Sequence, residues 1–400
     1  MNILFVSLDK IGGGYIDGSK IRSNFLLDAI RVANKDGKIY VLTSPESNVK
    51  SDCNMRVCHF DLGGKSYSYH TMKGLFRKFY KTLAGMGLLP KSLIEEYNPE
   101  TYFPNVEFDC VFLRYQKSAC LFPYYKLAPV ILDYDDHPLQ SFDTAIKYLM
   151  PVGVRPFAKV FSRIQFHIVR KHISVGFLSN EDQADKFGND VMYLPNAVQI
   201  PDVIYNPLCK EREYLFTIGS MGYPPNYLGV DKFLNEIWPS FHKKYPNVKY
   251  VIAGRGLPEL YARRWSMIGG VDYIGYVDDL DKAYERCLAT IVPIWAGSGT
   301  AIKTRESLIH SRCCLSSPFG ARGLENCLEL KNNGLFIFDN AMEFIKTFEM
   351  VLDEKLRVSY EQMAYQYAKE NFSYTIFEEK VKKAISMIGE GPRGSRGHRD

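Results

Sequence analysis

Short apolar segments alternate with longer amphipathic ones along this chain of 400 residues, and the alternation starts twice. The expected strands of the first half are 2–8, 38–44, 109–115, 128–136 and 173–179. An amphipathic stretch at 20–34 has the helical period, with apolar residues on one face. Short apolar strands separated by helices are typical of a parallel sheet that is covered on both faces. The first half is therefore predicted to be an α/β domain.

A stretch with three prolines and little periodicity, 195–207, separates the halves. After it, strands are expected at 214–220, 248–256, 271–277, 289–295 and 313–317, and helices at 226–245, 258–265, 280–287 and 300–311. The predicted division is a first domain at 1–195, a linker at 196–207, a second domain at 208–373, a helix at 374–388 and a disordered tail at 389–400. The helix is expected to pack back on the first domain. Two Rossmann-like domains should face each other across a cleft, with ligands at the carboxyl ends of the strands.

The composition excludes other classes of protein. Hydrophobic residues make up 46% of the chain and charged residues 24%, which is typical of a folded globular protein rather than a disordered one. No apolar run reaches the roughly 18 residues of a membrane span, and the first strand lacks the basic flank of a signal peptide. The net charge of +5 is low for a nucleic-acid binder. Nine cysteines without a C-x-x-C pattern favour reduced thiols in a cytoplasmic protein, with metal binding as the alternative.

The segment most informative about chemistry runs from the strand at 289–294 through Gly297–Gly299 into a helix expected to start at Thr300. Glycines let backbone amides approach a ligand closely, and a helix N-terminus attracts anions. Lys303 and Glu306 follow on one face of the helix, about 4.5 Å apart along its axis. Diphosphate at the helix start and ribose hydroxyls at the carboxylate would match a nucleotide. A surface ion pair on an ordinary helix is the alternative.

This segment resembles the donor-binding motif of glycosyltransferase family 4, in which a Gly-x-Gly-Thr turn precedes a lysine and a ribose-binding glutamate. Other similarities follow in order: Leu194–Val198, Gly219–Met221, Pro225-Asn226, Gly254–Gly256, 271–280 and Gly323–Glu325. They cover about residues 190–330 and match a branch of the family with a Gly-Ser-Met…Pro-Asn pattern. Two departures stand out. Ser298 occupies the place of a carboxylate that many members carry, and the turn after 214–218 lacks their arginine and lysine.

The resemblance implies a GT-B fold and retaining transfer of a sugar from a nucleotide sugar to a hydroxyl of a glycan or lipid-linked acceptor. It also implies a role in bacterial surface polysaccharide or glycolipid synthesis, without a cofactor or metal. The leaving diphosphate would be stabilised by the glycine-turn amides and by Lys303, whereas Glu306 would bind ribose. The predicted donor-binding residues are Gly13, Gly14, Tyr15, Ser220, Arg255, Tyr276, Val277, Gly297, Ser298, Gly299, Thr300, Lys303 and Glu306.

A glycine loop at 11–18 follows the first strand. It lacks the Gly-x-Gly-x-x-Gly spacing, and no acid ends the second strand, so dinucleotide binding is disfavoured. The family resemblance would bring Gly13, Gly14 and Tyr15 to the donor's phosphates and sugar. A plain strand-to-helix turn is the alternative.

An acidic loop follows the expected strand at 128–136, at the end where ligands bind. Asp135, Asp136 and His137 lie there, and such groups serve as general bases, metal ligands or binders of hydroxyls. Asp135 or His137 is predicted to orient hydroxyls of the acceptor or the donor sugar, and with Lys303 they form the predicted catalytic set. Helix capping and solvation of the loop are the alternatives.

Two stretches without acids, 68–92 and 144–179, together carry eleven lysines and arginines. In the first, basic residues interleave with aromatic and aliphatic ones, which suits an acceptor or an anionic membrane surface at the inner face of the plasma membrane. The basic residues predicted on this side are Lys73, Arg77, Lys78 and Lys81. For 144–179, a solvated helix packed on the sheet is favoured.

Three other functions remain open from the sequence. A nucleotide-sugar epimerase could use the same two domains. A non-catalytic sugar- or membrane-binding protein should bind nucleotides weakly. A dinucleotide-dependent oxidoreductase would need the cofactor-binding acid that is missing after the second strand.

Overall fold

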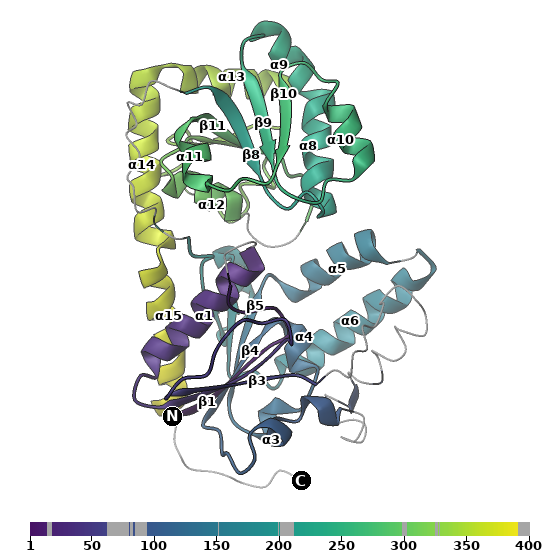
Figure 1. Cartoon of the computed structure of the whole chain (residues 1–400), viewed down its shortest axis with the longest axis vertical. Helices are drawn as coiled ribbons and strands as arrows, with labels where there is room; N and C mark the ends of the chain where they lie inside the picture. Colours follow the sequence, from purple (N-terminus) through teal and green to yellow (C-terminus); the bar gives the residue numbers. More distant parts are fainter. Residues whose placement is uncertain are drawn as a thin grey trace. The chain divides into compact units, whose positions relative to one another are not determined.

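The computed structural model describes residues 1–13, 18–61, 80, 83–84, 94–150, 152–198, 200, 212–297, 302–324, 327 and 329–390. The chain folds into two compact units (Figure 1). The first unit is Met1–Pro195 with Phe377–Asp400, and the second is Asn196–Ile376. Most of the predicted linker and of the predicted tail falls on 201–211 and 391–400, outside the described residues.

The first unit is built on a seven-stranded sheet in the order β3-β2-β1-β4-β5-β6-β7, in which all described pairs are parallel. The strands are β1 (Asn2–Ser7), β2 (Lys38–Thr43), β3 (Met55–His59), β4 (Cys110–Arg114), β5 (Val130–Asp135), β6 (Val175–Leu178) and β7 (Val191–Tyr193). The central strands are apolar and buried along most of their length, as expected for a sheet covered on both faces. The strand order reverses between β1 and β4, which places a ligand-binding switch point there.

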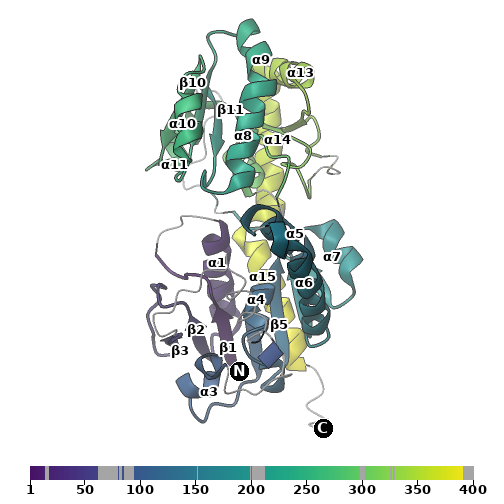
Figure 2. The ribbon, with the colours of Figure 1, turned by 90° about the vertical axis from the view of Figure 1, so that its right-hand side faces the viewer.

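Helices cover both faces of this sheet (Figure 2). They are α1 (Gly18–Ala33), η2 (Glu95–Tyr97), α3 (Pro99–Tyr102), α4 (Tyr115–Ala119), η3 (Tyr124–Lys126), α5 (Pro138–Leu149), η4 (Val152–Val154), α6 (Arg155–Arg170), α7 (Glu181–Phe187) and α15 (Tyr374–Glu390). From Phe377 on, α15 belongs to the first unit and packs against α1, where Phe25 and Phe377 meet edge to face with ring centroids 6.1 Å apart. The C-terminal helix therefore completes the first core.

The second unit contains a six-stranded parallel sheet in the order β10-β9-β8-β11-β12-β13. Its strands are β8 (Tyr214–Ile218), β9 (Lys249–Ala253), β10 (Val271–Gly275), β11 (Cys287–Val292), β12 (Cys314–Ser316) and β13 (Leu335–Ile337). Its helices are α8 (Pro224–Glu236), α9 (Trp238–Lys244), α10 (Glu259–Trp265), α11 (Leu280–Glu285), α12 (Ile302–Ile309), α13 (Ala341–Leu352) and α14 (Glu354–Phe372). The order reverses between β8 and β11, which is the switch point of this unit.

The α/β prediction with two parallel-sheet units is confirmed. One predicted helix is wrong in its extent, because 226–245 is divided into α8 and α9 at Ile237. Pro239 lacks the backbone N–H that would continue α8, and it occupies the first turn of α9, where proline is tolerated. No helix within the described residues is long and apolar enough to cross a membrane. The eight cysteines among those residues are free thiols, most of them buried.

Candidate active site

The predicted donor-binding residues of the second unit lie on loops at one edge of its sheet. Ser220 follows β8, Arg255 follows β9, and Tyr276 and Val277 follow β10. Gly297 follows β11 with a φ of 141°, a conformation that favours glycine. These loops leave the carboxyl ends of parallel strands, where open α/β sheets bind their ligands.

Lys303 is the basic group at the switch point between β8 and β11. Its ammonium donates to Asn226 Oδ1 at 3.1 Å, and the Asn226 amide donates to the carbonyl of Ser220 at 2.7 Å. A Cβ atom on Gly219 would lie 2.3 Å from Lys303 Cε, so a larger residue cannot occupy position 219 without moving the lysine. The lysine side chain is therefore held beneath the turn that follows β8.

Burial lowers the pKa of Lys303 from 10.5 to about 8, and Glu306 offsets this effect only in part. Among the described residues, no carboxylate oxygen forms an ion pair with its ammonium within 4 Å. A desolvated ammonium without a close counter-ion is stabilised by a bound anion, because opposite charge favours the charged form. This arrangement suits a phosphate ligand.

Glu306 lies one turn further along α12 and is half-buried. The Tyr284 hydroxyl donates to its Oε2 at 3.3 Å. Burial raises the pKa of Glu306, while His310, Tyr284 and Lys303 act in the opposite direction. The structure thus brings the lysine and the carboxylate together as predicted from their spacing, and it adds a tyrosine that the sequence did not reveal.

Arg255 and Tyr276 form an exposed planar surface beside this site. The Arg255 guanidinium lies 3.8 Å from the centroid of the Tyr276 ring, a cation–π contact. The Arg255 carbonyl accepts from the backbone amides of Met221 and Gly222 at 2.8 and 3.1 Å, which ties the β9 loop to the β8 loop. Guanidinium and phenol planes at the end of β10 are suited to contact with a flat base.

Nine predicted site residues lie outside the described residues: Gly14, Tyr15, Lys73, Arg77, Lys78, Lys81, Ser298, Gly299 and Thr300. Gly13 is described and has a φ of 69°, and the preceding Gly12 forms a bridge with Asn48. A Cβ on Gly12 would lie 2.2 Å from the Asn48 carbonyl oxygen, so glycine is required where this loop begins.

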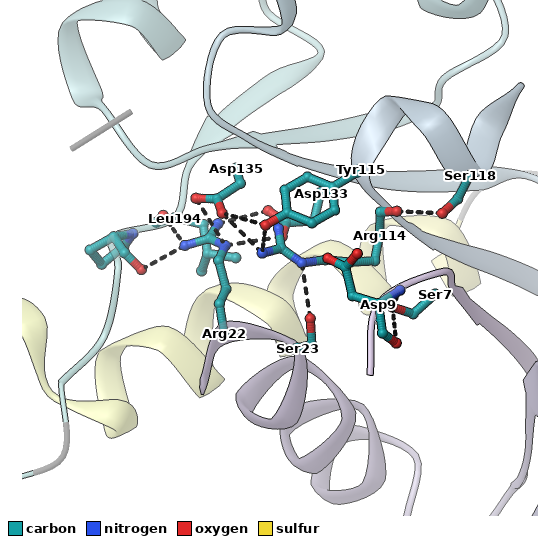
Figure 3. A network of polar contacts seen from close by, with 11 residues as sticks. Ser7, Asp9, Arg22, Ser23, Arg114, Tyr115, Ser118, Asp133, Asp135 and Leu194 are labelled. Carbon is teal, nitrogen blue, oxygen red and sulfur yellow. Dashed lines mark hydrogen bonds and ion pairs between the residues drawn. The ribbon is translucent and has the colours of Figure 1, made fainter. Parts of the chain in front are cut away.

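A buried ionic network lies at the carboxyl ends of β4 and β5 in the first unit (Figure 3). Asp133 is fully buried and accepts from Arg22 Nε and Nη2 at 3.0 and 2.7 Å and from Arg114 Nη1. Arg114 also donates to Asp135 Oδ2 at 2.9 Å and to the Tyr115 hydroxyl at 2.7 Å. The sequence predicted only Asp135 here. Its partners come from other elements, and none of them belongs to a motif.

Asp135 and Tyr115 both have left-handed backbones, with φ of 65° and 63°. Such strain in residues other than glycine costs roughly 1–3 kcal/mol and clusters at functional sites. Burial alone would raise the pKa of Asp135, but Arg114 and Arg22 hold it below its usual range. The lowered pKa favours the ionised carboxylate of Asp135, which accepts hydrogen bonds and is a weak base.

His137 has a different environment. Its ring packs against Phe166 and Phe187, with centroids 5.9 and 5.3 Å away. Burial lowers its pKa, which favours the neutral form of the ring. The ring contributes to an aromatic cluster, and it does not cap α5, which begins at the next residue.

Comparison with known proteins defines the class. Residues 212–354, which include Asn226, Lys303 and Glu306, match the family model described as "Glycosyl transferases group 1". The match covers most of the second unit, and the fold of the two units is that of GT-B glycosyltransferases. The prediction of this enzyme class is confirmed, whereas membership of family 4 and of its Gly-Ser-Met…Pro-Asn branch stays a prediction.

Three solved structures illustrate the shared fold. Sucrose-phosphate synthase from Thermosynechococcus elongatus is similar with a TM-score of 0.67 and 12% identity, over 97% of this chain and 99% of that one. Anabaena HepE in complex with UDP has a TM-score of 0.63 and 12% identity, over 97% and 100%. WaaG, a glycosyltransferase involved in lipopolysaccharide biosynthesis, also has a TM-score of 0.63 and 12% identity, over 97% of this chain and 100% of that one. No curated protein sequence matched the chain.

Proposed function

We propose that this protein transfers a sugar from a nucleoside-diphosphate sugar to an acceptor hydroxyl with retention of anomeric configuration. The observation that carries the proposal is Lys303, a half-buried ammonium fixed at the switch point of the second sheet with Glu306 on the same helix face. HepE, which shares the fold, binds UDP. A glycine turn, a positive charge and a carboxylate in this order along the chain match the phosphates and ribose of a nucleotide.

In this proposal the donor lies along the loop edge of the second sheet. Lys303 and the amides of the turn at Gly297 hold the diphosphate, Glu306 accepts hydrogen bonds from the ribose, and the base lies near Tyr276. The bond between the sugar C1 and the phosphate oxygen breaks, and the acceptor oxygen bonds to C1 from the same face. The acceptor's proton passes to the leaving diphosphate, whose growing charge Lys303 stabilises. No resident metal is needed for this neutralisation.

Asp135 is proposed to orient a hydroxyl of the acceptor or the donor sugar. Its lowered pKa makes it a hydrogen-bond acceptor rather than the base that removes a proton. The strained backbones of Asp135 and Tyr115 support a functional role for this edge. We also propose a glycan or lipid-linked acceptor in bacterial surface polysaccharide or glycolipid synthesis. The shared fold with WaaG, a glycosyltransferase involved in lipopolysaccharide biosynthesis, supports this choice of acceptor.

A peripheral membrane contact is proposed at α6, in the cytoplasm. Val160 and Ile164 are exposed on this helix beside the exposed Lys159 and Arg163, while its opposite face is buried. An apolar row with flanking cations suits an anionic bilayer surface. The sequence favoured a packed, solvated helix here, and the other basic stretch lies mostly outside the described residues. Sedimentation with phosphatidylglycerol vesicles should capture the protein, and Ile164→Asp should abolish capture.

The test of the donor site is ligand-induced thermal stabilisation by UDP, GDP and their sugars. A specific nucleotide should raise the melting temperature of the wild type through linkage. Lys303→Ala and Glu306→Ala should lose this rise, whereas Lys282→Ala, on the exposed surface of α11, should keep it. Equal stabilisation of all three variants would refute the site.

A further inference from the structure

Glu306 is supported by a tyrosine whose position is fixed by the second unit's core. Tyr284 is 1% exposed and lies on α11, with its hydroxyl 3.3 Å from Glu306 Oε2. Its ring packs edge to face on Phe216 of β8 at 5.5 Å. Burial raises the pKa of Tyr284 well above 10, so its hydroxyl keeps its proton and donates to the carboxylate.

His310 supports the same tyrosine from the end of α12. Its ring stacks on Tyr284 with centroids 4.1 Å apart and an interplanar angle of 19°. Nδ1 lies 2.6 Å from the backbone carbonyl oxygen of Glu306, and Nε2 lies 3.1 Å from Asp281 Oδ1. Both neighbours are hydrogen-bond acceptors, so whichever ring nitrogen carries the hydrogen can donate to one of them. The ring thus links α11 to the turn that carries Glu306.

Arg312 fixes the backbone on which Tyr284 is carried. Its buried guanidinium donates through Nε to the Tyr284 carbonyl at 2.7 Å and through Nη2 to the Glu285 carbonyl at 3.3 Å. The tyrosine is therefore held at its ring and at its backbone. A fixed donor on Oε2 restricts rotation of the Glu306 carboxylate, leaving Oε1 in a defined direction.

We propose that Tyr284 is a positioning residue, supported by His310, that orients the Glu306 carboxylate toward the hydroxyl pair of a ribose. This inference rests on the proposed function and extends it to specificity. A carboxylate held in one orientation can accept from two adjacent hydroxyls, and a site built for hydrogen bonding rejects ligands that lack a partner. The site should therefore prefer ribonucleotides to 2′-deoxyribonucleotides, and the preference should depend on the Tyr284 hydroxyl.

The test measures dissociation constants by calorimetry for UDP and GDP and for their 2′-deoxy forms. For the base that binds, the wild type should prefer the ribose form about tenfold or more. Tyr284→Phe should reduce the preference to about threefold or less while keeping the fold. Tyr250→Phe is the matched control, because that buried hydroxyl contacts Thr217 at 2.7 Å in the same unit, and it should leave the preference unchanged.

A second variant covers the case in which Tyr284→Phe does not fold. His310→Gln removes the ring stacked on Tyr284 and should also reduce the preference for ribose. A wild-type preference retained in folded Tyr284→Phe or, failing that, in His310→Gln would overturn the inference. Glu306→Gln distinguishes a failure of the inference about Tyr284 from a failure of the proposed donor site. If Glu306→Gln keeps the ribose preference, or if the wild type binds neither nucleotide, the proposed donor site itself is wrong.

Discussion

The low pKa of Lys303 makes nucleotide binding depend on pH in a defined direction. In the free protein, burial lowers the pKa of this lysine to about 8. A bound diphosphate favours the ammonium, so the pKa rises on binding and a proton is taken up wherever the free lysine is neutral. Affinity should therefore be level below about pH 7 and fall as the pH rises through 8.

The magnitude follows from the fraction of charged lysine. With a pKa of about 8, roughly nine-tenths of the free protein carries the ammonium at pH 7 and roughly one-tenth at pH 9. If only the charged form binds the diphosphate, the affinity for UDP or GDP falls about tenfold between these pH values. This loss corresponds to about 1.4 kcal/mol of binding free energy.

Isothermal titration calorimetry at pH 7, 8 and 9, in two buffers of different ionisation enthalpy, measures both the affinity and the proton uptake. Lys303→Met is the matched control, because it lacks the titrating group. It should bind the nucleotide weakly, and residue 303 should contribute no change of affinity with pH. Titration of the nucleotide itself cancels, since both proteins bind the same ligand. A wild-type affinity that does not fall, or an equal fall in Lys303→Met, would refute the reasoning.

Further predictions concern the support of the two candidate sites. Gly219→Ala should weaken nucleotide binding about tenfold or more in calorimetry, because its Cβ would displace the side chain of Lys303. Gly153→Ala is the control and should leave the affinity unchanged, because no heavy atom lies within 4 Å of the added Cβ. Arg114→Met should lower the free energy of unfolding by about 3–5 kcal/mol, because it removes one guanidinium and leaves Asp133 and Asp135 to share Arg22. Arg31→Met, which breaks an exposed pair, should cost about 1 kcal/mol or less in the same urea titration, and equal losses would contradict this explanation.

The sequence predicted the sheets because their central strands are apolar on both faces and therefore leave a strong signal. It missed β3, β7 and β13, which have only three to five residues. All three are edge strands that are only partly buried, so they lack the continuous apolar run that revealed the equally short β6 and β12. The helices α13 and α14 were also missed, although the side chain of Asn340 caps the first of them.

The second-unit site could be predicted because its main groups are close together on one helix. Lys303 and Glu306 are three positions apart, and this spacing alone places them on one face of a helix. Tyr284 could not be predicted, because its contact with Glu306 depends on how α11 packs beside α12. The Arg22–Asp133–Arg114 network was missed for the same reason, since its members come from three different elements.

The central claim is that the second unit binds a nucleoside diphosphate at Lys303 and Glu306. A crystal structure of the protein with UDP, or with GDP if that nucleotide gives the thermal shift, tests it most directly. We expect diphosphate oxygens within hydrogen-bond distance of Lys303 Nζ, and ribose hydroxyls on the Glu306 carboxylate. Bound nucleotide that contacts neither side chain would contradict it.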